Sequence, residues 1–287
     1  MGVKSDAHAI DKRKKQLLEQ EKKLRTRMNK IKHKIAVISG KGGVGKSTIT
    51  VNLAAAFAMH GHVDRVGILD ADIHGPSVPK IIGLTGRRLQ SGPLGIFPAI
   101  GPLGIRVVSM EFLLPDETAP VIWRGPLKMT AIRQFLTDIT WGDLDFLFID
   151  LPPGTGDEPL SVAQLLPEMD GVVIVTIPSE VSQIVVKKAV TFARKLSLPI
   201  IGIVENMSGF VCPKCGTKID IFRSGGGKKI SEQLSVPFIG SIPIDPKVCE
   251  DSDKGVPFII EHPDSSSSKA FKEIVKRIET FLEGRKK

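Results

Sequence analysis

The stretch IAVISGKGGVGKST, residues 35–48, decides the fold. Residues 35–39 are apolar or small, as in a buried strand, and the remainder fits the pattern G-x-x-x-x-G-K-S/T. Because glycine lacks a Cβ atom, the backbone N–H groups of such a loop can close around a polyphosphate, and the following helix adds donors at its N-terminus. We therefore predict a strand, a phosphate-binding loop and a helix in that order. The loop residues expected to contact ATP are Gly42, Gly43, Val44, Gly45, Lys46, Ser47 and Thr48.

Lysine and oxygen-bearing side chains supply the chemistry that such a loop needs. Lys46 is expected to neutralise the β- and γ-phosphates, and the Ser47 hydroxyl is expected to bind Mg²⁺. Asp150 ends an apolar strand, where a carboxylate suits the same metal. Asp70 and Asp72 end another strand, and their spacing places both side chains on the same side of an extended chain. We assign the metal to Asp70 and the attacking water to Asp72.

Short β-branched strands alternate with helical stretches along the rest of the chain. Near-continuous apolar strands separated by helices are typical of a parallel sheet with both faces covered. The expected strands are 35–39, 66–70, 106–109, 146–150, 172–177, 200–205 and 238–241, and the expected helices are 46–59, 127–137, 181–196 and 269–282. The sequence therefore predicts one doubly wound, mainly parallel α/β domain of the P-loop NTPase class over residues 35–287.

A basic arm precedes this domain. Residues 1–34 hold twelve Lys or Arg against four Asp or Glu, so they carry most of the net charge of +9. No aromatic residue that could stack on a base occurs before Phe57, so we expect no nucleic acid as a partner. The arm is interpreted either as a solvated helix or as a helix whose apolar stripe lies on the body or on a partner. That stripe consists of Ile10, Leu17, Leu24 and Ile31.

Composition excludes several classes of protein. The 287 residues are 41% hydrophobic and 25% charged, which suits a globular chain and excludes a disordered or fibrous one. Three cysteines are too few for a disulfide scaffold and favour reduced thiols. No apolar run approaches the ~18 residues that span a bilayer, and residues 1–34 contain no apolar core of a secretory signal. We expect a cytoplasmic protein with no membrane partner.

A second lysine in the glycine-rich loop separates this chain from ordinary P-loop proteins. The motif Lys-Gly-Gly-Val-Gly-Lys-Ser begins at Lys41 and resembles the deviant Walker A family of ATPases, which includes MinD, ParA and iron–sulfur cluster carriers. The resemblance implies that Lys41 reaches across a face-to-face homodimer onto the nucleotide of the partner subunit, as an arginine finger does in trans. It therefore assigns Lys41 a catalytic role.

Two cysteines lie three residues apart in a Gly- and Pro-flanked segment that we treat as an insertion over about residues 206–227. Cys212 and Cys215 can coordinate one metal ion or one edge of a cluster. However, zinc and a cubane cluster each take about four ligands. A symmetric dimer supplies four thiolates where one chain supplies two. The spacing alone leaves open a cluster, zinc, a redox dithiol or a plain turn.

The motifs in combination are similar to the Mrp/ApbC family, also called iron–sulfur cluster carrier proteins. They lie at residues 40–48, 70–77, 123–126, 150–157 and 206–216, and the resemblance covers roughly residues 33–283. It implies an ATPase that binds a labile [4Fe-4S] cluster between subunits through Cys212 and Cys215 and passes it to apo iron–sulfur proteins. It also implies that Asn206 reads the adenine edge and that the loop at Pro243 helps to enclose the base.

Two other functions remain as alternatives. A MinD- or ParA-like positioning ATPase would use the basic, apolar-faced helix expected over 269–282 as a membrane-surface helix, although such a helix more often closes an α/β core. A zinc-clasped ATPase chaperone would use the same two cysteines structurally. Cys249 receives no role, because the adjacent Glu250 and Asp251 disfavour its thiolate.

Overall fold

The structure is a computed structural model, and it describes residues 15, 18–73, 75–93, 95–113, 125–166, 168–212, 214–221 and 223–285. Its centre is an eight-stranded sheet that is parallel except at one edge, where β5 pairs antiparallel with β6. The spatial order of the strands is β12 (Phe238–Ser241), β9 (Ile200–Glu205), β8 (Gly171–Thr176), β1 (Ile31–Ser39), β7 (Leu144–Asp150), β2 (Val66–Asp70), β6 (Arg106–Ser109) and β5 (Ala99–Ile100).

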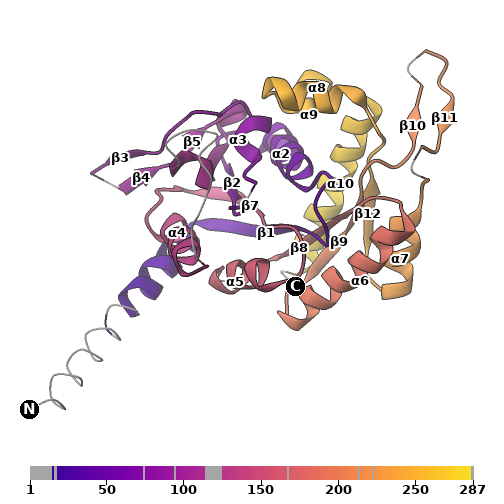
Figure 1. Ribbon diagram of the computed structural model, residues 1–287. Helices are drawn as coiled ribbons and strands as arrows, with labels where there is room; N and C mark the ends of the chain where they lie inside the picture. Colours follow the sequence, from indigo (N-terminus) through magenta and orange to yellow (C-terminus); the bar gives the residue numbers. More distant parts are fainter. Residues whose placement is uncertain are drawn as a thin grey trace, which may run out of the picture.

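Helices cover both faces of this sheet (Figure 1). One face carries α2 (Lys46–Phe57), α3 (Val78–Ile81), α9 (Phe258–Glu261) and α10 (Ser266–Gly284). Helix α8 (Pro246–Lys254) packs on α3 and α9. The other face carries α4 (Gly125–Thr137), α5 (Asp157–Leu165), α6 (Glu180–Lys195) and α7 (Gly226–Leu234). The predicted doubly wound α/β class is therefore confirmed.

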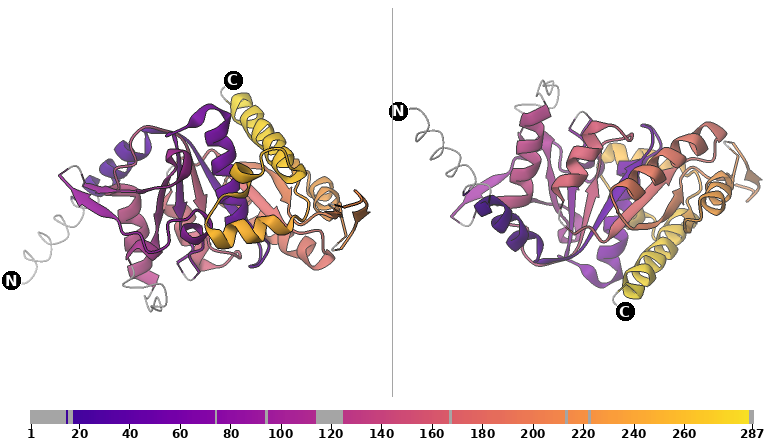
Figure 2. Two further views of the ribbon diagram at one scale, coloured as in Figure 1. Left: turned by 90° about the horizontal axis from the view of Figure 1, so that it is seen from above. Right: turned by 90° about the horizontal axis from the view of Figure 1, so that it is seen from below.

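Two small hairpins, three short helical turns and an N-terminal helix over residues 18–28 complete the described chain. The hairpins are β3 (Gln90–Gly92) with β4 (Gly95–Phe97) and β10 (Phe210–Val211) with β11 (Lys218–Ile219). The turns are η1 (Ala58–His62), η2 (Pro102–Gly104) and η3 (Met110–Leu113). The β10–β11 hairpin lies at the opposite end of the molecule from the N-terminal helix (Figure 2).

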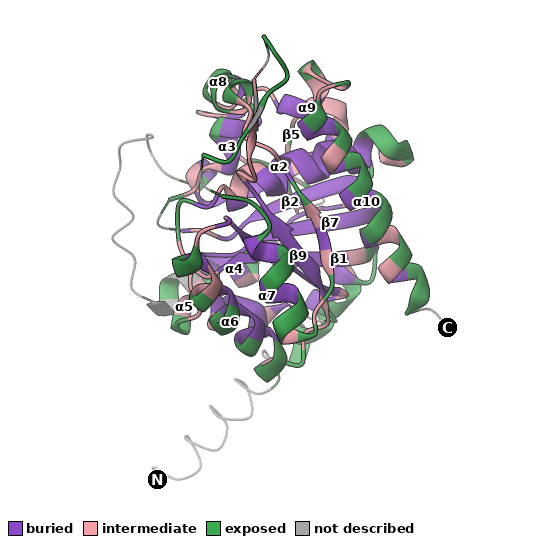
Figure 3. Cartoon of the chain, turned by 90° about the vertical axis from the view of Figure 1, so that its right-hand side faces the viewer, coloured by how far each residue is buried: buried purple, intermediate pink, exposed green. Residues whose placement is uncertain are grey.

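Strand β1 explains why the centre of the sheet is apolar on both sides. Ile35 and Val37 belong to the core cluster under α2, whereas Ala36 and Ile38 belong to the cluster on the opposite face. Successive strand residues point to opposite faces, so a strand covered by helices on both sides needs apolar residues at every position. Figure 3 shows this buried sheet between helices whose outer surfaces are exposed.

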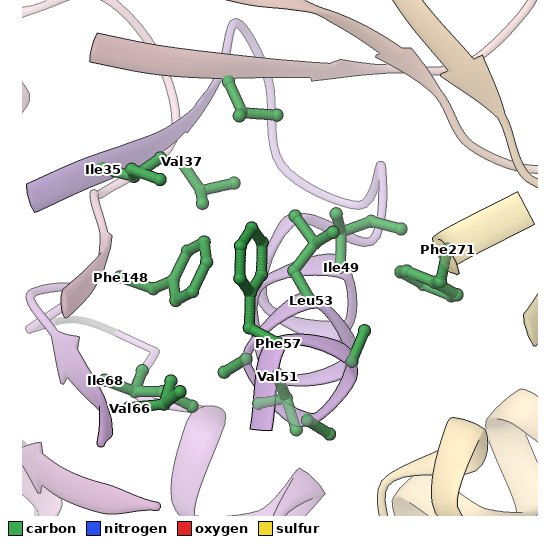
Figure 4. Packing of buried hydrophobic residues seen from close by; sticks show 14 of the residues in the cluster. Ile35, Val37, Ile49, Val51, Leu53, Phe57, Val66, Ile68, Phe148 and Phe271 are labelled. Atoms are coloured by element: carbon green, nitrogen blue, oxygen red, sulfur yellow. The ribbon is translucent and has the colours of Figure 1, made fainter. Parts of the chain in front are cut away.

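Helix α2 is buried along nearly its whole length, because the sheet lies on one side of it and α3, α9 and α10 contact the others. Its Phe57 ring packs against Phe146 with a centroid distance of 4.3 Å. It also packs against Phe148 at 5.4 Å, as Figure 4 shows. The helix that follows the phosphate-binding loop is thus anchored at both ends. The loop itself is held between a central strand and this buried helix.

The strand predicted over 35–39 begins four residues earlier, at Ile31. Residues 18–28 are helical, and Leu24, Met28 and Ile31 are buried against the face of the sheet that α4 covers. Backbone pairing of Ile31 with Leu144 extends the strand beyond the apolar run that the sequence displays. This part of the arm lies on the body and is not a fully solvated helix. Ile10 and Leu17 of the predicted stripe lie outside the described residues.

Helix α10 closes the core. Its apolar face, including Phe271, Ile274 and Ile278, is buried against β12 and α2. The membrane-surface interpretation of this helix needs that face exposed, so the structure favours the core-closing interpretation. Within the described part of the chain, no helix is both long enough and apolar enough to cross a membrane.

Candidate functional site

The predicted site lies at the carboxyl ends of three adjacent strands, β1, β7 and β2. Asp70 and Asp150 are register partners across β2 and β7, and Asp150 also pairs with Val37 of β1, just before the glycine-rich loop. Ligands of open α/β sheets bind at the carboxyl ends of the strands. Parallel pairing therefore brings together carboxylates that are 80 residues apart in the chain.

Glycines shape the loop. Gly43 and Gly45 have φ values of 77° and 81°, the left-handed region that other residues rarely adopt. Gly45 also has no room for a side chain, because a Cβ atom there would lie 2.3 Å from Nδ2 of Asn206. The loop thereby turns its backbone into the N-terminus of α2, as an anion site requires.

Asp150 is the centre of a buried hydrogen-bond network. Its Oδ2 atom accepts from Nζ of Lys46 at 2.6 Å and from Oγ of Ser47 at 2.5 Å, and its Oδ1 atom accepts from Oγ1 of Thr50 at 2.7 Å. The side chains of Lys46 and Asp150 are only 6% and 0% exposed, so each compensates the buried charge of the other. Thr50 was not predicted, although its position one turn after Lys46 is a signal that helix periodicity could have provided.

Asp70 and Asp72 lie beside this network. Asp70 is fully buried, accepts from Oγ of Ser109 at 3.1 Å, and has a pKa raised well above its ordinary value by burial and then by the charge of Asp150. The pKa of Asp72 is also raised, chiefly by burial, and its Oδ1 atom accepts from the Gly75 N–H at 3.3 Å. Ser109 ends β6 and was missed, because only strand order makes it a neighbour of Asp70.

These oxygens fit a magnesium ion. Mg²⁺ prefers hard oxygen ligands and is usually held by one or two carboxylates together with phosphates and waters. Ser47, Asp150 and Asp70 offer that donor set beside the phosphate-binding loop. Among the described residues, no three His, Cys, Asp or Glu side chains form a complete metal cage, so the remaining ligands would come from the nucleotide and water.

A cavity of about 340 Å³ adjoins the loop and contains both residues predicted to contact the base. Asn206 donates from Nδ2 to the Val44 carbonyl at 2.9 Å, and Pro243 belongs to the facing wall. The cavity is lined by Gly45, Thr48, Ile49, Asn206, Met207, Ile242–Pro246, Val248, Cys249, Ser252 and Phe271. Cys249, which received no role from the sequence, is an exposed thiol of α8 on this wall.

Lys41 is half-buried in the loop, where its carbonyl accepts from Oγ of Ser39 at 2.9 Å. Its ammonium makes no ion pair within the described part of the chain. The described residues therefore give this charge no structural task, whereas Lys46 of the same loop is held by Asp150.

Cys212 and Cys215 lie in the connection of the β10–β11 hairpin, which projects from the body (Figure 1). The Cys212 N–H donates to the Thr217 carbonyl at 2.9 Å, and the Gly216 N–H donates to the Cys212 carbonyl at 2.8 Å, so the turn is closed. Cys212 is half-buried and Cys215 exposed. The Thr217 hydroxyl, 3.2 Å from Sγ of Cys215, and the Thr217 N–H lower the pKa of that thiol.

The described residues supply no third protein ligand beside these two thiols. His or carboxylate side chains of the same chain therefore do not complete a zinc site in the part of the molecule that the structure covers. Four motif residues, His74, Trp123, Arg124 and Pro213, lie outside the described residues.

Comparisons with known proteins define the family. Residues 30–279 match the model of the ParA family, which is described as "NUBPL iron-transfer P-loop NTPase". The iron–sulfur cluster carrier protein of Methanocaldococcus jannaschii is 55% identical over 273 residues, which cover 95% of this chain and 93% of the relative. The carrier protein of Saccharolobus solfataricus is 53% identical over 261 residues, covering 91% of this chain and 88% of the relative.

Solved structures agree with this assignment. A nucleotide-binding protein of Archaeoglobus fulgidus in complex with ADP has a TM-score of 0.74 and 42% identity, and the match covers 83% of this chain and 92% of that one. The MinD cell division protein of Aquifex aeolicus shares the fold, with a TM-score of 0.62 and 21% identity over 86% of this chain and 97% of its own. The chain therefore belongs to the NUBPL iron-transfer P-loop NTPase family, as its motifs predicted.

Proposed function

We propose that the protein is an ATP-dependent iron–sulfur cluster carrier, which holds a [4Fe-4S] cluster as cargo between two copies of the chain and passes it to apo iron–sulfur proteins. The observation that carries this proposal is the thiol pair of Cys212 and Cys215 on a hairpin that projects from a P-loop body. The names of the 55% and 53% identical relatives support the same cargo.

The ligand count supports a homodimer. One hairpin offers two thiolates, whereas a [4Fe-4S] cluster takes about four. Two hairpins related by a two-fold axis supply the missing pair, and the same axis would let Lys41 of each chain reach the nucleotide of its partner. Within the residues that the structure describes, the ammonium of Lys41 has no ion-pair partner and the thiol pair has no third protein ligand; these independent observations are both explained by one dimer.

The nucleotide chemistry follows from the buried network. Ser47, Asp150 and Asp70 would hold Mg²⁺, which when bound supplies charge neutralisation for the phosphates. Lys46 binds the β- and γ-phosphates, and Asp72 orients the attacking water. Since Lys41 must come from a second copy, hydrolysis is slow in the monomer and depends on the dimer. The predicted boundary at residue 35 shifts in this proposal, because the ATPase domain includes β1 from Ile31 onward and the buried Leu24 and Met28.

Metal content of the dimer tests the proposed cargo. Anaerobically reconstituted wild type should hold about four iron and four acid-labile sulfide per dimer, with the visible absorption of a cluster. The Cys212→Ala/Cys215→Ala double variant should lose both, because it removes every thiol of the hairpin, whereas Cys249→Ala should keep its iron. Iron, sulfide and zinc are measured in the same samples. Stoichiometric zinc without iron would replace the carrier proposal with a zinc-clasped ATPase.

Replacing Asp72 by asparagine should lower ATP turnover by about 100-fold and leave nucleotide affinity nearly unchanged, because an amide cannot accept a proton from water. Asp72 lies outside the hydrogen-bond network of Asp150, so the loop itself should remain intact. Steady-state hydrolysis and equilibrium nucleotide binding are compared, with Asp253→Asn on the exposed side of α8 as the matched control. Wild-type turnover in Asp72→Asn would assign the water to another residue.

A further inference from the structure

Glu205 is a buried carboxylate that neither the nucleotide chemistry nor the thiols use. It is the last residue of β9, and it is 0% exposed. It precedes Asn206, which lines the cavity of about 340 Å³ beside the phosphate-binding loop, called the base cavity below. Burying a carboxylate is costly unless hydrogen bonds compensate it. Its partners therefore indicate what the charge does in this fold.

The partners of Glu205 lie on both sides of the cysteine hairpin. Its Oε1 atom accepts from Oγ of Ser208 at 2.5 Å, on the strand that leads to Cys212. The same Oε1 atom accepts from the Gly225 N–H at 2.9 Å, and Oε2 accepts from the Gly227 N–H, both at the start of helix α7, where the chain returns from the hairpin. One carboxylate thus joins the two ends of the segment that carries the thiols.

The returning end is also the start of helix α7. Gly225 is the N-cap residue, with φ of 79°, and it has no side chain to satisfy the first N–H groups of the helix. Glu205 accepts from those groups, and a carboxylate at a helix N-terminus is further stabilised by the helix dipole. Space is tight here, because a Cβ atom at Gly227 would lie 2.9 Å from Cβ of Glu205 and one at Gly226 would lie 2.3 Å from the Pro178 carbonyl oxygen.

The leading end is bonded to the wall of the base cavity. The Ser208 N–H donates to the Ile242 carbonyl at 2.9 Å, and the Ile244 N–H donates to the Gly209 carbonyl at 2.8 Å. Phe210, two residues before Cys212, forms a parallel bridge with Ile244. Ile242 and Ile244 both line the cavity, so the strand that leads to the thiols is a direct extension of the cavity wall.

Each end also contains a left-handed residue that is not glycine. Met207, between Asn206 and Ser208, has φ of 56°, and Arg223, between β11 and α7, has φ of 69°. Such conformations cost about 1–3 kcal/mol each and persist only where surrounding contacts impose them. Arg223 is paired with Glu180 of α6, and Met207 lines the base cavity. The contacts around these two residues thus fix the backbone at both ends of the hairpin.

We propose that Glu205 is a positioning residue that locks both ends of the cysteine hairpin to the nucleotide site, so that occupation of the base cavity changes the environment of Cys212 and Cys215. Asn206 starts this connection at the Val44 carbonyl of the phosphate-binding loop, and Glu205 keeps the hairpin from moving independently of it. The inference rests on the proposed nucleotide site and deepens the coupling in the carrier proposal. It does not require that the cargo be iron.

Thiol alkylation in the metal-free, reduced full-length protein tests this inference. Iodoacetamide labelling is followed by mass spectrometry with and without a non-hydrolysable ATP analogue and Mg²⁺. Cys249 lines the base cavity, so its protection reports occupancy in the same sample. In wild type we expect the analogue to change the labelling rate of Cys212 and Cys215 by about fivefold, the low end of usual coupling between sites.

Glu205→Gln should abolish this response of Cys212 and Cys215, while the analogue still protects Cys249. The amide keeps the shape of the side chain, but its NH₂ group cannot accept a hydrogen bond, so the bonds at one end of the hairpin are lost. Glu232→Gln, on the exposed side of α7, is the matched control and should behave as wild type. Ser208→Ala is a second, milder variant, which keeps the test available if Glu205→Gln does not fold. It removes one of the three hydrogen bonds of Glu205 and keeps the carboxylate, so it should lower the response of the hairpin thiols by half or more.

A nucleotide response of the hairpin thiols that persists in both Glu205→Gln and Ser208→Ala would overturn the role of Glu205. Protection of Cys249 in wild type without any change at Cys212 and Cys215 would overturn the coupling itself. Neither outcome depends on iron content, so failure of this inference is distinguishable from failure of the carrier proposal. If a saturating concentration of the analogue does not protect Cys249, the prediction that the base binds in this cavity is wrong. This inference would then fail with it.

Discussion

Lys46→Ala should reduce the affinity for ATP by at least about 100-fold. The variant loses a charge-assisted hydrogen bond to the phosphates, and it also loses the cation that offsets the negative charge of the nearby carboxylates. Nζ of Lys46 lies 2.6 Å from Asp150, and its side chain is only 6% exposed. Without it, Asp150 and Asp72 would face a polyphosphate with no buried cation between them. Repulsion then replaces attraction at the centre of the site.

Equilibrium binding of a fluorescent ATP analogue measures this effect. Lys188→Ala, on the exposed surface of α6, removes the same charge elsewhere and should bind as wild type does. Because the variant leaves Asp150 buried without its ion-pair partner, binding is measured well below the melting temperature of each protein. Affinity within threefold of wild type would mean that backbone N–H groups alone hold the phosphates.

Lys41→Ala should lower ATP turnover by about 1,000-fold, at the low end of what a cation supplied in trans contributes to phosphoryl transfer. Nucleotide affinity should change little, because Lys41 makes no ion pair within the described chain and its carbonyl contact with Ser39 survives the substitution. The contrast with Lys46 follows from geometry. One lysine is bonded inside its own site, and the other is free to act on a second copy.

Mixing two inactive variants distinguishes action in trans from action in cis. In a mixed dimer, the Lys46→Ala chain supplies Lys41 to the nucleotide bound by the Lys41→Ala chain. An equal mixture should recover about one quarter of wild-type turnover, since half of the dimers are mixed and each has one complete site. No recovery, or normal hydrolysis by Lys41→Ala alone, would exclude the trans-acting lysine.

The fold was predictable because its determinants are local. Apolar runs mark the strands at 66–70, 106–109, 200–205 and 238–241, whose bounds the structure reproduces. A central parallel strand must be apolar at every position, and this pattern is visible without any partner. Strand β1 departs from it, because its first residues are held by pairing with β7 and by Leu24 and Met28 beneath them.

Individual residues of the nucleotide site were also predictable, since a phosphate-binding loop needs glycines, a lysine and a hydroxyl at set spacing. Asp70 and Asp150 lie side by side at the ends of adjacent strands, as their strand-end positions indicated, and Lys46 and Ser47 at the start of α2 bond to Asp150. The roles of Lys41 and Asp72 remain predictions. Both act on groups that a single chain does not contain.

The sequence by itself thus determined the doubly wound fold, the phosphate-binding loop and the pair of thiols, because each rests on the identity and spacing of residues close together in the chain. Only the tertiary structure decided that Cys249 lines the cavity beside the phosphate-binding loop and that Glu205 joins the two ends of the cysteine hairpin. The partners of Glu205 are backbone N–H groups and a serine up to 22 residues away. Such contacts leave no pattern in the sequence, because any residue has an N–H group and only folding brings it to the carboxylate.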